Sequence, residues 1–290
     1  MFKTLRNAWS IADLRKKLMF TLFILLIYRV CSAIPVPFVD VKGMGEYFGE
    51  SLNNTILGLY NAMSGSAFSQ ASVLALGIQP YINASIIVQL LTVAIPALER
   101  MAKEQGEIGK KKIERITRYT TVGLGLLLGF AYYTMIANAT YIDPKTFQEL
   151  PVLPETGLMV AIVVILTFTA GSCFVMWMGE QINEKGIGNG ISMILFANIL
   201  TGFPSMVSTL TSGTFPWWVA AIIAVAVLLM VVFIVFVNDA ERRIPIQYAK
   251  RVVGRKVYGG QSTNLPIKVS MSGVMPVIFA QSIVSVPATI

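Results

Sequence analysis

The residues of this sequence that could recognise a partner gather in one stretch, residues 238–270. The stretch carries seven basic and two acidic residues and lies between two long apolar runs. Cations at this density attract anionic partners. Alternating apolar and polar residues at 244–248 and 252–258 predict two short strands, with Gly259-Gly260 as the turn. The stretch is therefore a candidate docking hairpin, and a solvated loop that only fixes membrane topology is the alternative.

The residue types that usually carry catalysis or bind metals are nearly absent elsewhere. The sequence contains no histidine, which is the commonest metal ligand and general base. Cys31 and Cys173 lie in separate apolar runs without metal-type spacing, and both fit small packing residues. Arg29 is the one ionisable residue that we place within a membrane span. We therefore expect no catalytic residue, no metal site and no cofactor, and we expect that the protein is not an enzyme.

The composition predicts an all-α, polytopic membrane helix bundle. Hydrophobic residues make up 55% of the 290 residues and charged residues only 13%, about half the usual share of a soluble domain. Apolar runs of membrane-crossing length predict seven spans. The expected spans are 18–34, 72–96, 119–137, 157–178, 187–203, 215–237 and a last one beginning near 267.

The distribution of positive charge predicts the orientation of the bundle. All Lys and Arg residues except Arg29, Lys42 and Lys145 fall at the chain start or in loops that share one side of the predicted topology. Basic residues near span ends stay in the cytoplasm, so the N-terminus is predicted to be cytoplasmic. Residues 1–17 fit an amphipathic segment on the anionic lipid surface. Arg29 is costly in a span unless it snorkels or finds a partner, so we expect it either to find a partner within the bundle or to anchor at the outer interface.

Residues 53–70 form an unusual segment between the first two predicted spans. The segment is too polar and too rich in Ser and Gly to face lipid, yet too apolar for an ordinary loop. Leu57, Tyr60, Met63 and Ala67 recur at helical spacing. Irregular backbone at membrane depth requires surrounding protein or a water-filled cavity. We predict a re-entrant, plug-like element, and a surface helix on the outer face is the alternative.

Aliphatic residues within the spans could form a narrow apolar constriction. Ile82 and Ile86 share one face of a helix, and Leu195 and Ile199 do the same farther along the chain. Ile278 lies in the first half of the last predicted span. If these faces converge, they form a ring that resists ions and water. Core packing or lipid exposure is the ordinary alternative for such a pattern.

A tight turn is predicted between the fourth and fifth spans, within residues 179–192. Its glycines permit positive φ and close approach of the flanking helices. A Gly-rich turn alone is a weak phosphate-binding signal, and no strand precedes it, so nucleotide binding is not expected.

Several motifs together resemble those of the SecY family, the central subunits of the bacterial protein-translocation channel, in their Gram-positive form. The segments that carry the resemblance read YRVCSAIPVP, ALGIQPYINASIIVQLL, EKGIGNGIS, ERRIPIQYAKR, STNLPIKV and GVMPVIFAQSI. The resemblance covers essentially the whole chain. It implies an inverted-repeat channel of ten spans, of which this chain would hold seven. We therefore expect the sequence to be part of a longer protein.

The resemblance also implies roles for individual residues. The plug would include Asn54, Leu57, Tyr60, Met63 and Ser64. The pore ring would include Ile82, Ile86, Leu195, Ile199 and Ile278. A lateral gate toward lipid would involve Gln89 opposite Ser282 and Ile283. Arg243, Lys250, Arg251, Arg255 and Lys256 would contact the ribosome or the SecA motor ATPase.

Three functional hypotheses follow from these residues. The leading one is a protein-conducting channel, divided into residues 1–17, a first half at 18–203 with the plug, and the start of a second half at 204–290. Its implied partners are SecE, the small subunit SecG, SecA, the ribosome, the passing polypeptide and membrane lipids, and its implied location is a bacterial plasma membrane. A secondary solute transporter with inverted repeats is the alternative. A ribosome anchor without a pore is the third.

Overall fold

The computed structural model consists mainly of helices, and it divides into two compact units, residues 1–204 with 284–290 and residues 205–283. The described residues are 9–49, 56–104, 106–142, 148–211, 216–246, 251–253, 256–258, 263–269 and 280. The helices of the first unit are α2 (Ala12–Ser32), α3 (Val41–Tyr47), α4 (Ile56–Ser64), α5 (Gln79–Ala94), α6 (Pro96–Glu104), α7 (Gly106–Ala137), α8 (Leu158–Lys185) and α9 (Gly190–Thr201).

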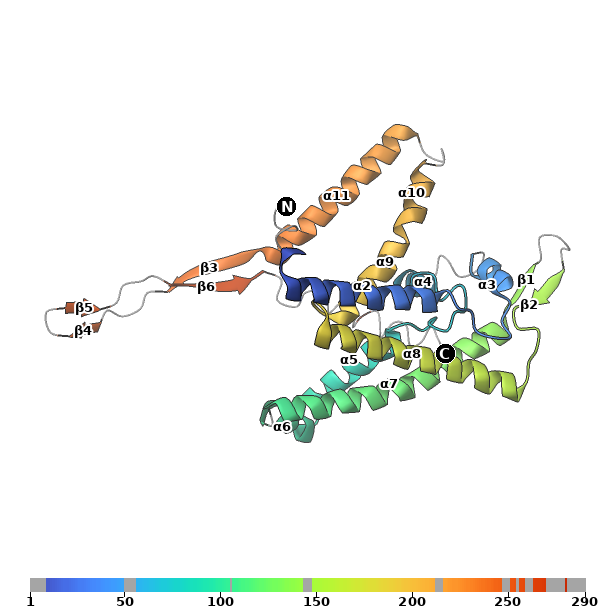
Figure 1. The fold of residues 1–290 in the computed structure, drawn as a ribbon, viewed down its shortest axis with the longest axis horizontal. Helices are drawn as coiled ribbons and strands as arrows, with labels where there is room; N and C mark the ends of the chain where they lie inside the picture. The colour runs from blue at the N-terminus through green and yellow to red at the C-terminus, as the bar shows by residue number, and fades with distance from the viewer. Residues whose placement is uncertain are drawn as a thin grey trace. The chain divides into compact units, whose positions relative to one another are not determined.

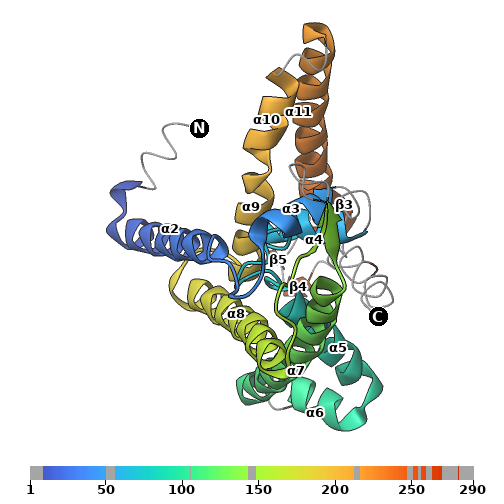
Figure 2. The same cartoon turned by 90° about the vertical axis from the view of Figure 1, so that its right-hand side faces the viewer.

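The long helices α7 and α8 lie side by side at the centre of the first unit, with α2 against α8 and α5 against α7 (Figures 1 and 2). Small residues allow the close approach of α7 and α8. A Cβ atom on Gly129 would lie 3.3 Å from the Ile165 carbonyl oxygen, and one on Gly125 would lie 3.3 Å from Thr169 Cγ2. Arg118 Nε and Glu180 Oε1 form an ion pair of 2.7 Å between the same two helices.

The second predicted span differs from its expected form. Residues 72–78 are buried turns, and the helix α5 begins only at Gln79. It ends before Pro96, where the chain bends by 101° into α6. Proline has no backbone N–H and clashes with the preceding turn, which explains the break. The stretch left between the second and third predicted spans is also largely helical, because α6 and the first turns of α7 occupy it.

The predicted turn between α8 and α9 is confirmed, although it is shorter than expected. Gly188 has a φ of +72°, a left-handed conformation that glycine adopts without strain. A Cβ on Gly190 would lie 2.0 Å from the Gly179 carbonyl oxygen, so the two helices touch through backbone. The Asn189 side chain caps α9 by accepting from Ile191 N and Ser192 N.

Two further helices follow, α10 (Phe203–Thr211) and α11 (Trp217–Asp239). The outer loop predicted after residue 203 is therefore largely helical. Among the described residues, four helices are long and apolar enough to cross a membrane, 106–137, 158–185, 190–208 and 218–239, and the bent pair α5–α6 can add a fifth. The predicted first span lies in α2, which is not among them because its helix also contains the cations Arg15–Lys17.

The basic stretch of the second unit forms a nested hairpin rather than the one predicted. The outer strands β3 (Glu241–Ile246) and β6 (Thr263–Lys268) pair antiparallel, and so do the inner strands β4 (Arg251–Val253) and β5 (Lys256–Tyr258). The strand predicted at 252–258 is therefore divided between two antiparallel partners, and the predicted turn at Gly259-Gly260 lies outside the described residues. Because residue 267 lies in β6, the last predicted span does not begin there.

One end of the first unit is closed by a small apolar core. Strands β1 (Thr140–Ile142) and β2 (Glu149–Pro151) pair beside α3, and Tyr141 Oη donates to Asp40 Oδ2 at 2.9 Å. Buried side chains from α3, α7, α8 and the turns after α4 form the core, among them Met44, Phe48, Phe68, Tyr132, Ile136, Val152, Leu153 and Phe168.

Candidate functional site

The predicted plug segment contains a short helix, α4, followed by buried turns. Helix α4 covers residues 56–64 and packs against α9. The turns from residue 65 to 78 are mostly buried. The expectation of a helix within this segment is confirmed, and Asn54 lies outside the described residues. The buried turns agree with the rule that irregular backbone at membrane depth needs a protein environment.

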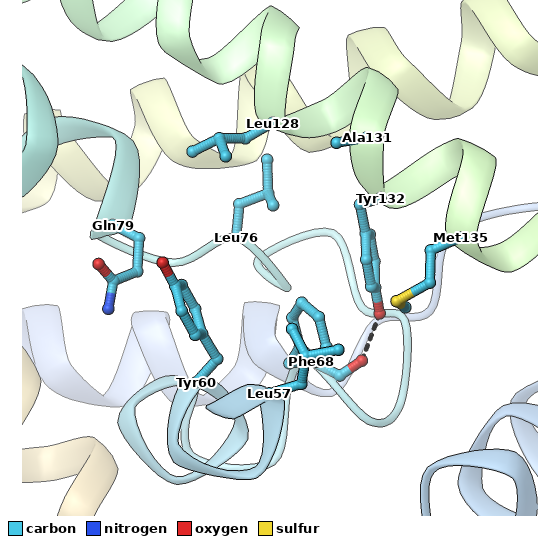
Figure 3. A pocket seen from close by; sticks show the side chains of 9 residues that line it. All are labelled: Leu57, Tyr60, Phe68, Leu76, Gln79, Leu128, Ala131, Tyr132 and Met135. Carbon is cyan, nitrogen blue, oxygen red and sulfur yellow. Dashed lines mark hydrogen bonds between the residues drawn. The ribbon is translucent and has the colours of Figure 1, made fainter. Parts of the chain in front are cut away.

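The turns after α4 are bonded to the chain that follows α2 and to α7. Val36 N donates to the Ala71 carbonyl at 3.0 Å, and Val73 N donates to the Ile34 carbonyl at 2.9 Å, as in a short antiparallel pairing. Tyr132 Oη on α7 donates to the Phe68 carbonyl oxygen, the dashed bond in Figure 3. These contacts satisfy backbone groups that water cannot reach. The segment from 67 to 73 is therefore a fixed part of the bundle.

Aromatic rings fill the space around this fastening point. The ring centroid of Phe68 lies 4.5 Å from that of Tyr132 and 5.7 Å from that of Phe48, and Tyr132 is 4.8 Å from Phe168. Rings at these separations and tilts attract one another beyond simple burial. The cluster joins α7, α8 and the turns after α4 in one apolar core.

An apolar cavity of about 80 Å³ remains between α4 and α7 (Figure 3). Leu57 and Tyr60 line it from α4, and Leu128, Ala131 and Met135 line it from α7. Phe68, Leu76, Gln79 and Tyr132 complete the lining. The cavity therefore borders α4, α7 and the turns that follow α4.

The predicted pore-ring residues lie in different environments. Ile82 and Ile86 are buried on α5, with 7% and 5% of their surface exposed. Leu195 is half-buried and lines a small cavity together with Tyr60, Met63 and Ser64, so it lies next to α4. Ile199 is 62% exposed. The structure therefore brings Leu195 to the predicted plug, and a ring around a common axis stays a prediction.

Ile278, Ser282 and Ile283 lie outside the described residues. Gln89, the other predicted gate residue, is exposed on α5. It lines a cavity of about 220 Å³ together with Thr92 and with Glu114 and Thr117 of α7. The predicted gate side of α5 therefore borders an open, partly polar cavity.

The predicted docking residues are only partly described. Arg242 and Arg243 are exposed on β3, opposite Ile267 and Pro266 of β6. Arg251 and Lys256 lie in the inner strands, and Lys250 and Arg255 lie outside the described residues. The β3–β6 ladder thus presents exposed cations on a backbone held by strand pairing.

Sequence reasoning missed residues that act through tertiary contacts. Tyr28 and Tyr132 are buried tyrosines. The Tyr132 hydroxyl donates to Phe68 in the turns after α4, and the Tyr28 hydroxyl accepts from Asn198, which also donates to Met63 of α4. A tyrosine in an apolar run is the available signal, because a buried hydroxyl needs a partner. In the part of the chain that the structure describes, no three His, Cys, Asp or Glu side chains gather as a metal site.

These features define a polytopic helical membrane protein with a short, half-buried helix between its spans, the class to which helical membrane channels belong. A model of the SecY family matches residues 72–290. Protein translocase subunit SecY of Streptomyces galbus is 44% identical over 299 residues, covering 100% of this chain and 67% of the relative. The Escherichia coli K12 subunit is 42% identical over 285 residues, covering 97% of this chain and 62% of the relative.

Solved structures give the same fold. A protein-conducting channel matches with a TM-score of 0.61 at 17% identity, covering 95% of this chain and 57% of the channel chain. Sec61 in the canine ribosome–channel complex from the endoplasmic reticulum matches with a TM-score of 0.61 over 95% of this chain and 58% of its own. The chain belongs to the SecY family, and it is a subunit of a protein-conducting translocation channel.

Proposed function

We propose that this chain builds the pore of a translocase in a bacterial plasma membrane, with its N-terminus in the cytoplasm. Unfolded secretory polypeptides would cross through an apolar constriction, and membrane proteins would leave sideways into lipid. Residues 53–70 would close the resting pore. Such a pore needs no chemistry of its own, since its seal depends on narrow apolar walls.

The placement of α4 carries this proposal. The helix packs against α9, and the half-buried Leu195 lines the same small cavity as Met63. A short, half-buried helix that packs on a longer helix and lies beside Leu195 fits a removable closure better than a surface helix. The burial of Ile82 and Ile86 is compatible with an inward-facing pair.

The gate and the docking loop complete the proposal. Gln89 would belong to a lateral gate with Ser282 and Ile283. The cations of residues 238–268 would bind the ribosome or SecA, because ribosomal RNA and acidic protein surfaces attract them. SecE and SecG would be the partner subunits. The structure of Sec61 in a ribosome–channel complex supports a ribosomal partner for a protein of this fold.

Site-specific crosslinking tests the pore. In the complete translocase, Cys31 and Cys173 are replaced by Ala, and a single cysteine is placed at Ile82 or at Ile278. A stalled secretory chain carrying a thiol-reactive probe is expected to crosslink to both positions. Leu228, which is 67% exposed on α11, supplies the control cysteine that should give no product.

The pattern of products separates the hypotheses. Crosslinking at Ile82 and Ile278 no stronger than at the Leu228 control would contradict the pore hypothesis. Ribosome binding without crosslinks would favour the third hypothesis, a ribosome anchor without a pore. No observation in this structure favours a solute transporter.

A further inference from the structure

The C-terminal end of α4 presents carbonyl groups that the helix cannot satisfy, as every helix does. Two of the carbonyls at this end receive hydrogen bonds from side chains of other helices. Asn198 Nδ2 on α9 donates to the Met63 carbonyl at 2.8 Å. Arg29 Nη1 on α2 donates to the Gly65 carbonyl at 3.2 Å. The end of α4 is thus tied to two neighbouring helices by polar contacts.

The Asn198 amide is fully used at this position. Its Nδ2 also donates to Tyr28 Oη at 2.9 Å, so its two N–H groups have separate partners. Asn198 and Tyr28 are 2% and 1% exposed, and both border a cavity of about 530 Å³ beside α2 and α9. Because the Met63 carbonyl can only accept, the amide nitrogen must face it. The orientation of the side chain is therefore fixed by its surroundings.

Gly65 lets α9 approach the end of α4. Its φ is +65°, and a Cβ atom there would lie 3.2 Å from Asn198 Oδ1 and 3.3 Å from Asn198 Cα. A larger residue would push α9 away and lengthen the bond to Met63. The close approach and the hydrogen bonds depend on one another.

Arg29 adds charge to this arrangement. The C-terminus of a helix carries partial negative charge, which a cation stabilises. The guanidinium also donates to Ser32 Oγ at 3.5 Å, so it is held on its own helix while it reaches Gly65. The expectation that Arg29 finds a partner within the bundle is confirmed.

The apolar side of α4 is not close-packed against α7. A cavity of about 80 Å³ borders Leu57 and Tyr60, so part of the surface between the two helices is out of van der Waals contact. Atoms that line a void lose dispersion attraction. The polar contacts at the end of the helix therefore account for more of its attachment than they would in a close-packed seat.

We propose that Tyr28, Arg29 and Asn198 form a polar latch, which positions α4 and sets how readily it leaves its seat. The latch rests on the proposed role of residues 53–70 as the plug. Residues 67–73 are held separately by residues 34–36, which follow α2, and by Tyr132 of α7, so release of the latch frees α4 while the turns after it stay in place.

Hydrogen–deuterium exchange of the complete translocase in lipid nanodiscs tests the latch. Asn198→Leu keeps the side-chain size and removes both donors. The amides of residues 60–66 should exchange about five- to tenfold faster, the factor that one hydrogen bond contributes. The amides of α8 are the internal reference and should not change. Asn138→Leu is the matched control, since Asn138 directly follows α7 and its amide donates to the Thr134 carbonyl of that helix.

Two milder variants keep the test decisive if Asn198→Leu folds poorly. Tyr28→Phe removes a single oxygen atom, and Arg29→Met removes the charge. Each should accelerate the same amides by a smaller factor. Unchanged exchange at residues 60–66, or an equal rise throughout α2, α8 and α9, would overturn the latch, because general loosening is not release of α4.

Resting ion conductance in planar bilayers separates the latch from the plug. Asn198→Leu and Arg29→Met should raise the conductance, and deletion of 53–70 should raise it further. If the deletion raises conductance but the exchange of α4 is unchanged in the variants, the plug role is supported and the latch is contradicted. If the exchange of α4 rises but the deletion leaves conductance unchanged, the contacts that position α4 are supported and the plug role is contradicted.

Discussion

The seat of α4 and the basic hairpin are held in place by different means. Around α4, side chains from α2, α7 and α9 bond backbone atoms far away in the sequence, and the residues involved are mostly buried. In the hairpin, β3 and β6 hold each other by backbone pairing. Even the directly opposed Ile244 and Leu265 remain 41% and 50% exposed.

This contrast separates two kinds of functional region. The position of α4 depends on contacts within this chain, so substitutions nearby should alter stability and the resting state. The hairpin exposes its cations to solvent, so substitutions there should alter binding and leave the fold intact. Substitutions in each region should therefore move different measurements.

The largest expected effect comes from Gly171→Ala on α8. The new Cβ atom would lie 2.0 Å from the Val73 carbonyl oxygen, in the fastened turns after α4. Backbone cannot move aside as a flexible side chain does, so we expect a loss of about 3 kcal/mol, as for severe overpacking. Thermal unfolding in detergent micelles measures the loss.

Gly123→Ala on α7 is the matched control for this substitution. A Cβ there meets nothing within 4 Å, so the change should be neutral or stabilise the helix by up to about 1 kcal/mol. Equal stability of the two variants would show that α8 does not pack closely against the turns after α4. It would then contradict the claim that contacts within this chain hold the region around α4.

The hairpin provides the second prediction. Arg255→Glu with Lys256→Glu should weaken binding of the ribosome or SecA by about tenfold or more, and the remaining affinity should depend less on salt. Sedimentation with ribosomes across a salt series measures both effects. Thermal unfolding should stay as in the unmodified protein.

Lys42→Glu serves as the control for charge, because it reverses an exposed cation in α3. It should leave binding unchanged. Affinity unaffected by the double reversal would remove Arg255 and Lys256 from the docking surface. A large loss of stability would instead place them among residues that hold the fold.

Composition predicted the long apolar helices well and the backbone between them poorly. A long apolar segment can cross lipid only as a helix, and the span predicted at 215–237 lies close to the observed bounds of α11, Trp217–Asp239. Residues 72–78 are equally apolar but form buried turns, because Ala71 and Val73 pair with the chain after α2. Periodicity in a short apolar run does not distinguish these outcomes.

The charged segments show the same limit. Lys110–Lys112 indicated a loop, yet they lie in α7, since polarity reports exposure to water and not backbone conformation. The need of Arg29 for a partner could be predicted from its cost in a span. Its actual partner, Gly65, could not, because the pairing depends on how α2 and α4 pack.

The smallest expected effect sharpens the description of the α4 seat. Tyr132→Phe keeps the ring between Phe68 and Phe168 and removes the hydroxyl that donates to the Phe68 carbonyl. The carbonyl keeps its bond from Ala71 N at 3.1 Å and loses this second donor, so stability should fall by about 1 kcal/mol. Tyr119→Phe, at a side chain that is 72% exposed on the same helix, should cost almost nothing. The amides of residues 69–73 should exchange faster in Tyr132→Phe while those of α4 change little, because the latch at Asn198 is intact. A rise confined to α4 would mean that Tyr132 acts on the plug helix itself and that the turns after it are not independently fastened.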